Sequence, residues 1–153
     1  MKVFDYEIGD WVFFVGAGEV KLGRVEGIVQ DGSRRFILYQ GVWYKASSVE
    51  PVQITGYALQ NNCFIPELMG DKYDYSLTEE CGRKIIVSSN QQWLVTDNKW
   101  GLQVKGTDDE MSGICELTYI HELQHALKLF ESPVTIDTLQ PSSVLWPKPG
   151  DNK

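Results

Sequence analysis

The first third of the chain alternates short apolar runs with glycine-containing turns. Alternation of this kind over four to eight residues is typical of half-buried β-strands, and glycine after Asp marks a tight hairpin. The pattern predicts strands at residues 8–15, 22–29, 36–39 and 42–44, with a hairpin turn at Asp31-Gly32. Pro51 closes the run, because proline cannot join a central strand. So many short strands in so little chain predict an SH3-like β-barrel at residues 1–52.

The middle of the chain predicts a linking helix followed by a small antiparallel sheet. Residues 54–62 have the composition of a two-turn helix, with Thr55 as its N-cap. Residues 64–70 have the composition of a loop. Beyond them, β-branched and aromatic residues predict strands at 73–77, 84–87, 92–95 and 102–104.

From about residue 111 to 131 the apolar positions recur with the period of a helix, and Ser132-Pro133 ends it. A helical projection puts Ile120, Leu123, Leu127 and Phe130 on one apolar stripe, which we expect to face the core. Residues 134–136 suggest one more strand. The chain is therefore expected to have an α+β fold with three parts: the barrel (1–52), a small antiparallel sheet with the C-terminal helix (53–138), and a proline-containing loose tail (139–153).

Composition and charge restrict the classes of partner. The chain has 153 residues, 42% of them hydrophobic, and a net charge of −7. Duplex nucleic acid is excluded as an expected partner, because binding phosphates requires clustered Lys and Arg. Three cysteines without a C-x-x-C pair predict free thiols in a reducing compartment. No signal peptide and no run of 18 apolar residues is expected, so we predict an intracellular protein without a membrane partner.

The segment His121-Glu122-Leu123-Gln124-His125 carries the main candidate chemistry and contains both histidines of the chain. On a helix, positions i and i+4 share a face, so the two imidazoles could bind zinc while Glu122 acts as the general base. The segment resembles the active helix of zinc peptidases of the metzincin group. Catalytic zinc needs a third protein ligand, and Glu131 is the nearest substitute. On a continuing helix, Glu131 would lie about 100° away from the midpoint of the histidines.

The same helix has a second interpretation that needs no metal. The helical projection places His121 and His125 opposite the apolar stripe, with Lys128 nearby, so this outer face could contact a partner protein. The barrel offers another surface, because Trp11, Trp43 and Tyr44 lie in or beside its predicted strands. With Tyr39 they could line a groove for a methylated or proline-rich ligand, or they could form the barrel core.

The order of several landmarks resembles a group of uncharacterised small proteins encoded by Bacteroidetes and their phages, including crAss-like phages. The landmarks are Ile8-Gly9-Asp10-Trp11-Val12, Gly41-Val42-Trp43-Tyr44, Val49-Glu50-Pro51-Val52, Tyr73-Asp74-Tyr75 and the helix Tyr119 to His125. In that group the helix has the form Tyr-Val-His-x-Leu-Gln-x, often with Gln and Asn at the positions of Glu122 and His125. The resemblance implies that these residues mark a helix rather than an active site, and it supplies no activity.

Together these patterns predict a non-enzymatic protein without a cofactor, located in the bacterial cytoplasm or in a virion. We expect it to bind a protein partner through Trp11, Trp43 and Tyr44, or through the helix face around Lys128. The alternative is a zinc-dependent metallopeptidase with His121, His125 and Glu131 as metal ligands and Glu122 as the catalytic base.

Overall fold

The computed structural model of the chain describes residues 4–70, 72–89, 99–108 and 110–147. The chain divides into two compact units, residues 1–52 with 145–153 and residues 53–144. Within the described ranges, the strands form three antiparallel sheets and only one helix is longer than two turns. The structure is thus mostly β, and an α+β description fits it.

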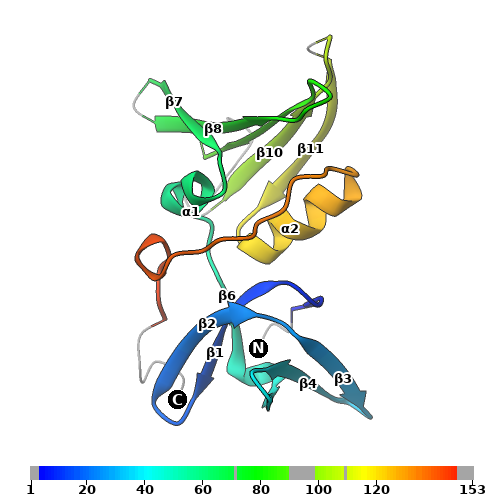
Figure 1. Ribbon diagram of the computed structural model, residues 1–153, viewed down its shortest axis with the longest axis vertical. Coiled ribbons are helices and arrows are strands. Elements are labelled where there is room, and N and C mark those ends of the chain that lie inside the picture. The colour runs from blue at the N-terminus through cyan, green and yellow to red at the C-terminus, as the bar shows by residue number, and fades with distance from the viewer. Residues whose placement is uncertain (1–3, 71, 90–98, 109, 148–153) are drawn as a thin grey trace. The chain divides into compact units, whose positions relative to one another are not determined.

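The first unit contains two three-stranded antiparallel sheets (Figure 1). The first has the order β2-β1-β6 and the second the order β3-β4-β5. The predicted strand at 22–29 is divided at Val25-Glu26, where the chain leaves the first sheet and enters the second. The sheets are separate, so the structure does not show one closed barrel. The strands are β1 (Trp11–Gly16), β2 (Glu19–Arg24), β3 (Gly27–Asp31), β4 (Arg34–Tyr39), β5 (Val42–Lys45) and β6 (Val49–Pro51).

Phe14 lies at the centre of the first unit's core. Its ring stacks on Tyr39 with 4.5 Å between centroids and 8° between planes, and it lies 5.0 Å from the ring of Tyr44. A Cβ added to Gly23 would lie 2.2 Å from the Tyr39 ring, so only glycine fits beneath this stack. The aliphatic part of the core comes from both sheets and the loop between them: Val12, Val25, Ile37 and Val49.

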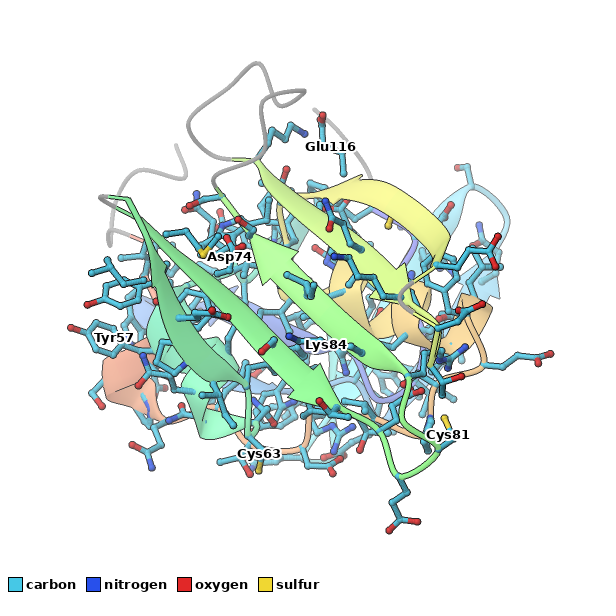
Figure 2. All side chains as sticks on the ribbon, turned by 90° about the horizontal axis from the view of Figure 1, so that it is seen from above. Tyr57, Cys63, Asp74, Cys81, Lys84 and Glu116 are labelled. Atoms are coloured by element: carbon cyan, nitrogen blue, oxygen red, sulfur yellow. The ribbon has the colours of Figure 1, made fainter. Side chains whose placement is uncertain are left out.

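The second unit contains a five-stranded antiparallel sheet with the order β11-β10-β9-β8-β7. Figure 2 shows one face of this sheet, with the helices behind it. The predicted strands at 73–77, 84–87 and 102–104 are confirmed, whereas 92–95 lies outside the described residues. The expected loop at 64–70 is instead mostly a strand, and no strand forms at 134–136. The strands are β7 (Ile65–Met69), β8 (Lys72–Thr78), β9 (Lys84–Ser88), β10 (Trp100–Lys105) and β11 (Met111–Leu117).

Helix α1 (Gly56–Asn61) confirms the predicted linking helix and its cap. The Thr55 hydroxyl accepts a hydrogen bond from the Ala58 N–H at 3.1 Å, which satisfies one of the free donors at the helix start. Just after the helix, the buried Asn62 side chain donates to the Thr138 carbonyl at 2.7 Å and accepts from the Asp137 N–H at 2.9 Å. The predicted tail (139–153) begins just beyond this amide and is itself held at its start, because the Gln140 N–H donates to the Asn61 side chain at 3.3 Å and the Thr55 hydroxyl donates to the Ser143 carbonyl. The expectation of a loose tail is therefore wrong for residues 140–143.

Helix α2 (Ile120–Leu129) is about half as long as predicted. Residues 111–117 form β11 instead, because they pair with β10 and complete the sheet. At the other end, Glu131 adopts a φ of +56°. The Glu131 N–H then bonds to the Lys128 carbonyl at 3.0 Å and the Ser132 N–H to the Leu127 carbonyl at 2.8 Å, which ends the helix in a Schellman-type turn. The predicted apolar stripe is otherwise correct: Ile120, Leu123 and Leu127 are buried and Phe130 is half-buried.

Candidate functional site

The two histidines of α2 lie in an aromatic row. The His121 ring is nearly parallel to Tyr119, with 5.8 Å between centroids and 13° between planes, and it meets the His125 ring edge-on at 5.5 Å. His121 is only 3% exposed, so the expectation that both histidines face solvent is wrong for this residue. His125 is half-buried, and of the three residues only Lys128 is exposed.

Glu122, the acidic residue between the histidines, is hydrogen-bonded to the backbone at the start of the helix. One carboxylate oxygen of Glu122 accepts hydrogen bonds from the backbone N–H groups of Thr118 and Tyr119, both at 2.9 Å. These are contacts of the kind that stabilise a helix N-terminus, since they pair backbone groups with an acid at the positive end of the dipole. Glu122 thus has a structural role in the geometry shown here.

The proposed third zinc ligand does not join the histidines. The turn at Glu131 takes this residue out of the helix and places it beside the connection between β8 and β9. Among the described residues of the second unit, no three His, Cys, Asp or Glu side chains have ligand atoms within 4.8 Å of one another. The unit therefore brings two imidazoles together but does not add a third protein ligand, which catalytic zinc requires.

The predicted aromatic groove is not assembled either. Tyr39 and Tyr44 both pack against Phe14 inside the first unit. Trp11 lies in the other sheet, where the Arg24 guanidinium sits 5.5 Å from the centre of its ring. Trp43 is the neighbour of Tyr44 along β5 and so points to the opposite, outward face of the sheet.

The outward face of the β3-β4-β5 sheet carries a strip of apolar side chains, which we call the Trp43 face. The strand register aligns Gly27 with Leu38 and Trp43 in one row, and Val29 with Phe36 in the next row on the same face. Trp43 and Val29 are 48% and 47% exposed. The indole reaches across the sheet, because a Cβ added to Gly27 would lie 3.6 Å from it. Arg34 and Lys45, both exposed, lie beside the strip.

A second candidate site lies entirely within the second unit, at the connection between β8 and β9. It is an open pocket of about 770 Å³, which we call the β8–β9 pocket. One wall comes from the end of β8 and the following turn, and the other from the segment after α2. The lining residues are Leu77, Thr78, Glu79, Glu80, Cys81, Arg83, Glu131, Pro133 and Val134.

A buried ion pair forms part of the pocket wall. The Glu79 side chain is fully buried and accepts a forked pair of hydrogen bonds from Arg83, Nε to Oε1 at 2.6 Å and Nη2 to Oε2 at 3.2 Å. The remaining terminal nitrogen of Arg83 donates to the Phe130 carbonyl at the end of α2, at 2.9 Å. The Ser132 hydroxyl also donates to Glu79. This network fixes the β8–β9 turn to the end of the helix.

The network shifts the pKa values of both partners in the directions that favour their charged forms. Hydrogen bonds from Arg83 hold the pKa of Glu79 below its ordinary value of 4.5, against the opposing effect of burial, and Ser132 adds to the lowering. The bond to Glu79 raises the pKa of Arg83. Sequence patterns alone did not identify this site. Its one local signal is a carboxylate and a guanidinium four residues apart around Cys81-Gly82, where Gly82 takes a φ of +93°.

Comparisons with known proteins leave the chain without an assigned family. No family model, no curated protein and no solved structure matches it. In the described part of the chain, no helix combines the length and the apolar character needed to cross a membrane.

Proposed function

We propose that the chain is a non-enzymatic protein-interaction protein whose first unit is an SH3-like module that binds a partner through the Trp43 face. The observation that carries this proposal is the half-exposed Trp43, whose ring reaches Gly27 in a row of apolar side chains. The SH3-like description is supported by the bend at Val25-Glu26, which lets one stretch of chain contribute strands to both small sheets.

The Trp43 face has the composition expected of an interaction surface. Contiguous exposed apolar side chains on a small protein are characteristic of binding sites, and tryptophan is enriched among the residues that dominate binding energy. A tryptophan buries about 200 Å², so covering the exposed half of Trp43 removes roughly 100 Å² from water. At about 25 cal/mol per Å², that contributes about 2.5 kcal/mol, or roughly 60-fold in affinity.

The resemblance to phage and Bacteroidetes proteins supplies the setting of this proposal. A small interaction protein without a cofactor would act in the bacterial cytoplasm or as a component of a virion. Its partner would be a protein rather than duplex nucleic acid, which is consistent with the net charge of −7.

Site-specific photo-crosslinking tests the proposal. A photoreactive amino acid is placed at position 29 or 45 on the Trp43 face, or at position 19 on β2 as the control, and the chain is produced in its own cells. We expect a discrete crosslinked partner from positions 29 and 45 that is absent from position 19 and is lost when Trp43→Ser is added. Equal crosslinking from all three positions, or none from the Trp43 face, contradicts the proposal.

Metal content distinguishes this function from the zinc-peptidase alternative. The protein is purified without added zinc and its metal content is measured, with His125→Ala as the comparison. A non-enzymatic interaction protein should hold no stoichiometric zinc in either form. Near one zinc per chain in the wild type and none in His125→Ala would instead favour the metallopeptidase.

A further inference from the structure

The β8–β9 pocket has a wall that is already organised before any ligand arrives. Glu79 is a fully buried carboxylate whose position is fixed by the forked contact with Arg83 and by Ser132. Arg83 is fixed in turn by the Phe130 carbonyl. These two charges neutralise one another within the wall. A ligand therefore does not need to order this part of the pocket, which lowers the entropic cost of binding.

The remaining polar groups of the pocket give it an excess of negative charge. Glu80 and Glu131 are exposed, and neither carboxylate makes a hydrogen bond or ion pair with any residue that the structure describes. Glu131 lies close enough to Arg83 to contribute to its raised pKa. With Glu79 and Arg83 counted as a pair, Glu80 and Glu131 give the lining a formal net charge of −2.

The uncharged part of the lining is apolar. Leu77 comes from β8, while Pro133 and Val134 come from the segment after α2. The volume of about 770 Å³ falls within the range of small-molecule sites, which typically combine an apolar surface with a few placed polar groups. A ligand that fits both features has an apolar stem and a cationic end, as alkylamines, polyamines and the side chains of Lys and Arg do.

We propose that the β8–β9 pocket binds an organic cation, a primary ammonium or guanidinium group carried on an apolar stem. The stem lies along Leu77, Pro133 and Val134, and the charged end lies between Glu80 and Glu131. Anionic ligands are disfavoured by these same carboxylates, because no cation in the lining is left without a partner once Arg83 is paired with Glu79. The site is in the second unit and is independent of the Trp43 face.

Nuclear magnetic resonance titration of the full chain tests the proposal with a matched pair of probes, n-hexylammonium and the uncharged n-hexanol. We expect n-hexylammonium to shift the backbone signals of residues 77–83 and 131–134 in a saturable way, and n-hexanol to bind at least fivefold more weakly. The Glu80→Gln/Glu131→Gln variant should lose at least fivefold in affinity for n-hexylammonium. The control Glu67→Gln/Glu110→Gln, which removes two carboxylates outside the pocket, should bind as the wild type does.

With the first pair of probes, any of three results would overturn the proposal: equal affinity for n-hexanol, unchanged affinity in Glu80→Gln/Glu131→Gln, or chemical-shift changes spread over the signals of all acidic residues. A second pair of probes identifies the source of the cation. Tighter binding of spermidine than of the peptide acetyl-Gly-Lys-Gly-amide indicates a free polyamine, and the reverse order indicates a side chain of a partner protein. If both probes shift the pocket signals no more in the wild type than in Glu80→Gln/Glu131→Gln, the proposal fails.

The cysteines provide an independent measurement of the electrostatic potential in the pocket. Cys81 lines the pocket and is exposed, while Cys63 is exposed elsewhere in the second unit, as Figure 2 shows. Burial raises the pKa of the Cys115 thiol, so this half-buried residue should react slowly. For each cysteine, the rate of modification by a cationic thiosulfonate is divided by the rate with an anionic one. We expect this ratio to be severalfold higher at Cys81 than at Cys63. Loss of that preference in Glu80→Gln/Glu131→Gln supports the proposal, and equal ratios at Cys81 and Cys63 in the wild type contradict it.

Discussion

The Glu79–Arg83 pair gives a sharp prediction about the stability of the second unit. The Glu79 side chain is fully buried, whereas that of Arg83 is 24% exposed. Removing one partner of a buried ion pair typically costs about 3–5 kcal/mol, because the remaining charge is left in a poor environment. The substitution Arg83→Met keeps an aliphatic stem but removes the forked donors from Glu79. Ser132 still donates to the carboxylate, so we expect the free energy of unfolding to fall by an amount near the lower limit, about 3 kcal/mol.

The asymmetry between the two partners sharpens this prediction. Glu79→Gln removes the charge but keeps an acceptor, and Arg83 retains the Phe130 carbonyl and some access to water. We therefore expect Glu79→Gln to cost less, about 1–2 kcal/mol. The double variant Glu79→Leu/Arg83→Met replaces the pair by apolar groups and should cost less than Arg83→Met alone, since no buried charge is left unpaired.

The measurement must report on the second unit alone, because a chain with two units does not have to unfold in one step. Urea titrations followed by hydrogen exchange of peptides from residues 72–88 satisfy this requirement. A free energy of unfolding for Arg83→Met within about 0.5 kcal/mol of the wild type would contradict a stabilising role for the pair. So would a double variant whose loss of stability equals the sum of the losses in Arg83→Met and Glu79→Leu measured singly.

The same pair predicts how stability depends on pH. The folded state lowers the pKa of Glu79, so its contribution is complete above the ordinary value of 4.5 and is lost as pH falls through the lower folded value. Stability of the wild-type second unit should therefore decline in acid. The decline attributable to Glu79 should be smaller in Arg83→Met, because the largest cause of the lowered pKa is then absent.

Two further substitutions test the packing of each unit. Gly23→Ala should cost about 1–3 kcal/mol by overpacking against Tyr39, whereas Gly16→Ala, where the new Cβ would lie 3.7 Å from Tyr44, should be close to neutral in thermal unfolding; equal effects would contradict the fit beneath the aromatic stack. Asn62→Ala should cost about 2–3 kcal/mol and accelerate hydrogen exchange at residues 137–138, because it removes the buried amide that holds this segment; unchanged exchange there would contradict that role.

Local signals in the sequence predicted part of this fold. The hairpin at Asp31-Gly32 and the Thr55 cap were correct, because each depends on the chemistry of residues adjacent in the chain. The helix expected at 111–131 was wrong in its first half, since the sheet requires residues 111–117 as an edge strand beside β10. That pairing is a contact between segments, and the apolar period of a short stretch does not distinguish it from a helix.

The candidate sites were harder to predict for the same reason. Successive side chains of a strand point to opposite faces of the sheet, so the register of β5 decides which aromatic residue is exposed. Trp43 faces outward, whereas its neighbour Tyr44 packs on Phe14. Glu131 could be predicted to leave the histidines but not to line the β8–β9 pocket, because its destination depends on the left-handed turn at the end of α2. The sequence spacing of Glu79 and Arg83 does not predict a buried network, because the network depends on their hydrogen bonds to Ser132 and to the Phe130 carbonyl, which are distant in the chain.

We propose that the exposed Trp43 side chain serves partner binding and contributes little to the stability of the first unit, and one paired measurement on Trp43→Ser tests both parts. Thermal unfolding is measured together with the yield of the partner crosslinked at position 29. We expect the midpoint of unfolding to fall by only a few degrees, because the side chain is half-exposed. The crosslink yield should fall by at least tenfold. An unchanged yield in a folded variant would contradict the claim, as would a variant that loses the fold of the first unit.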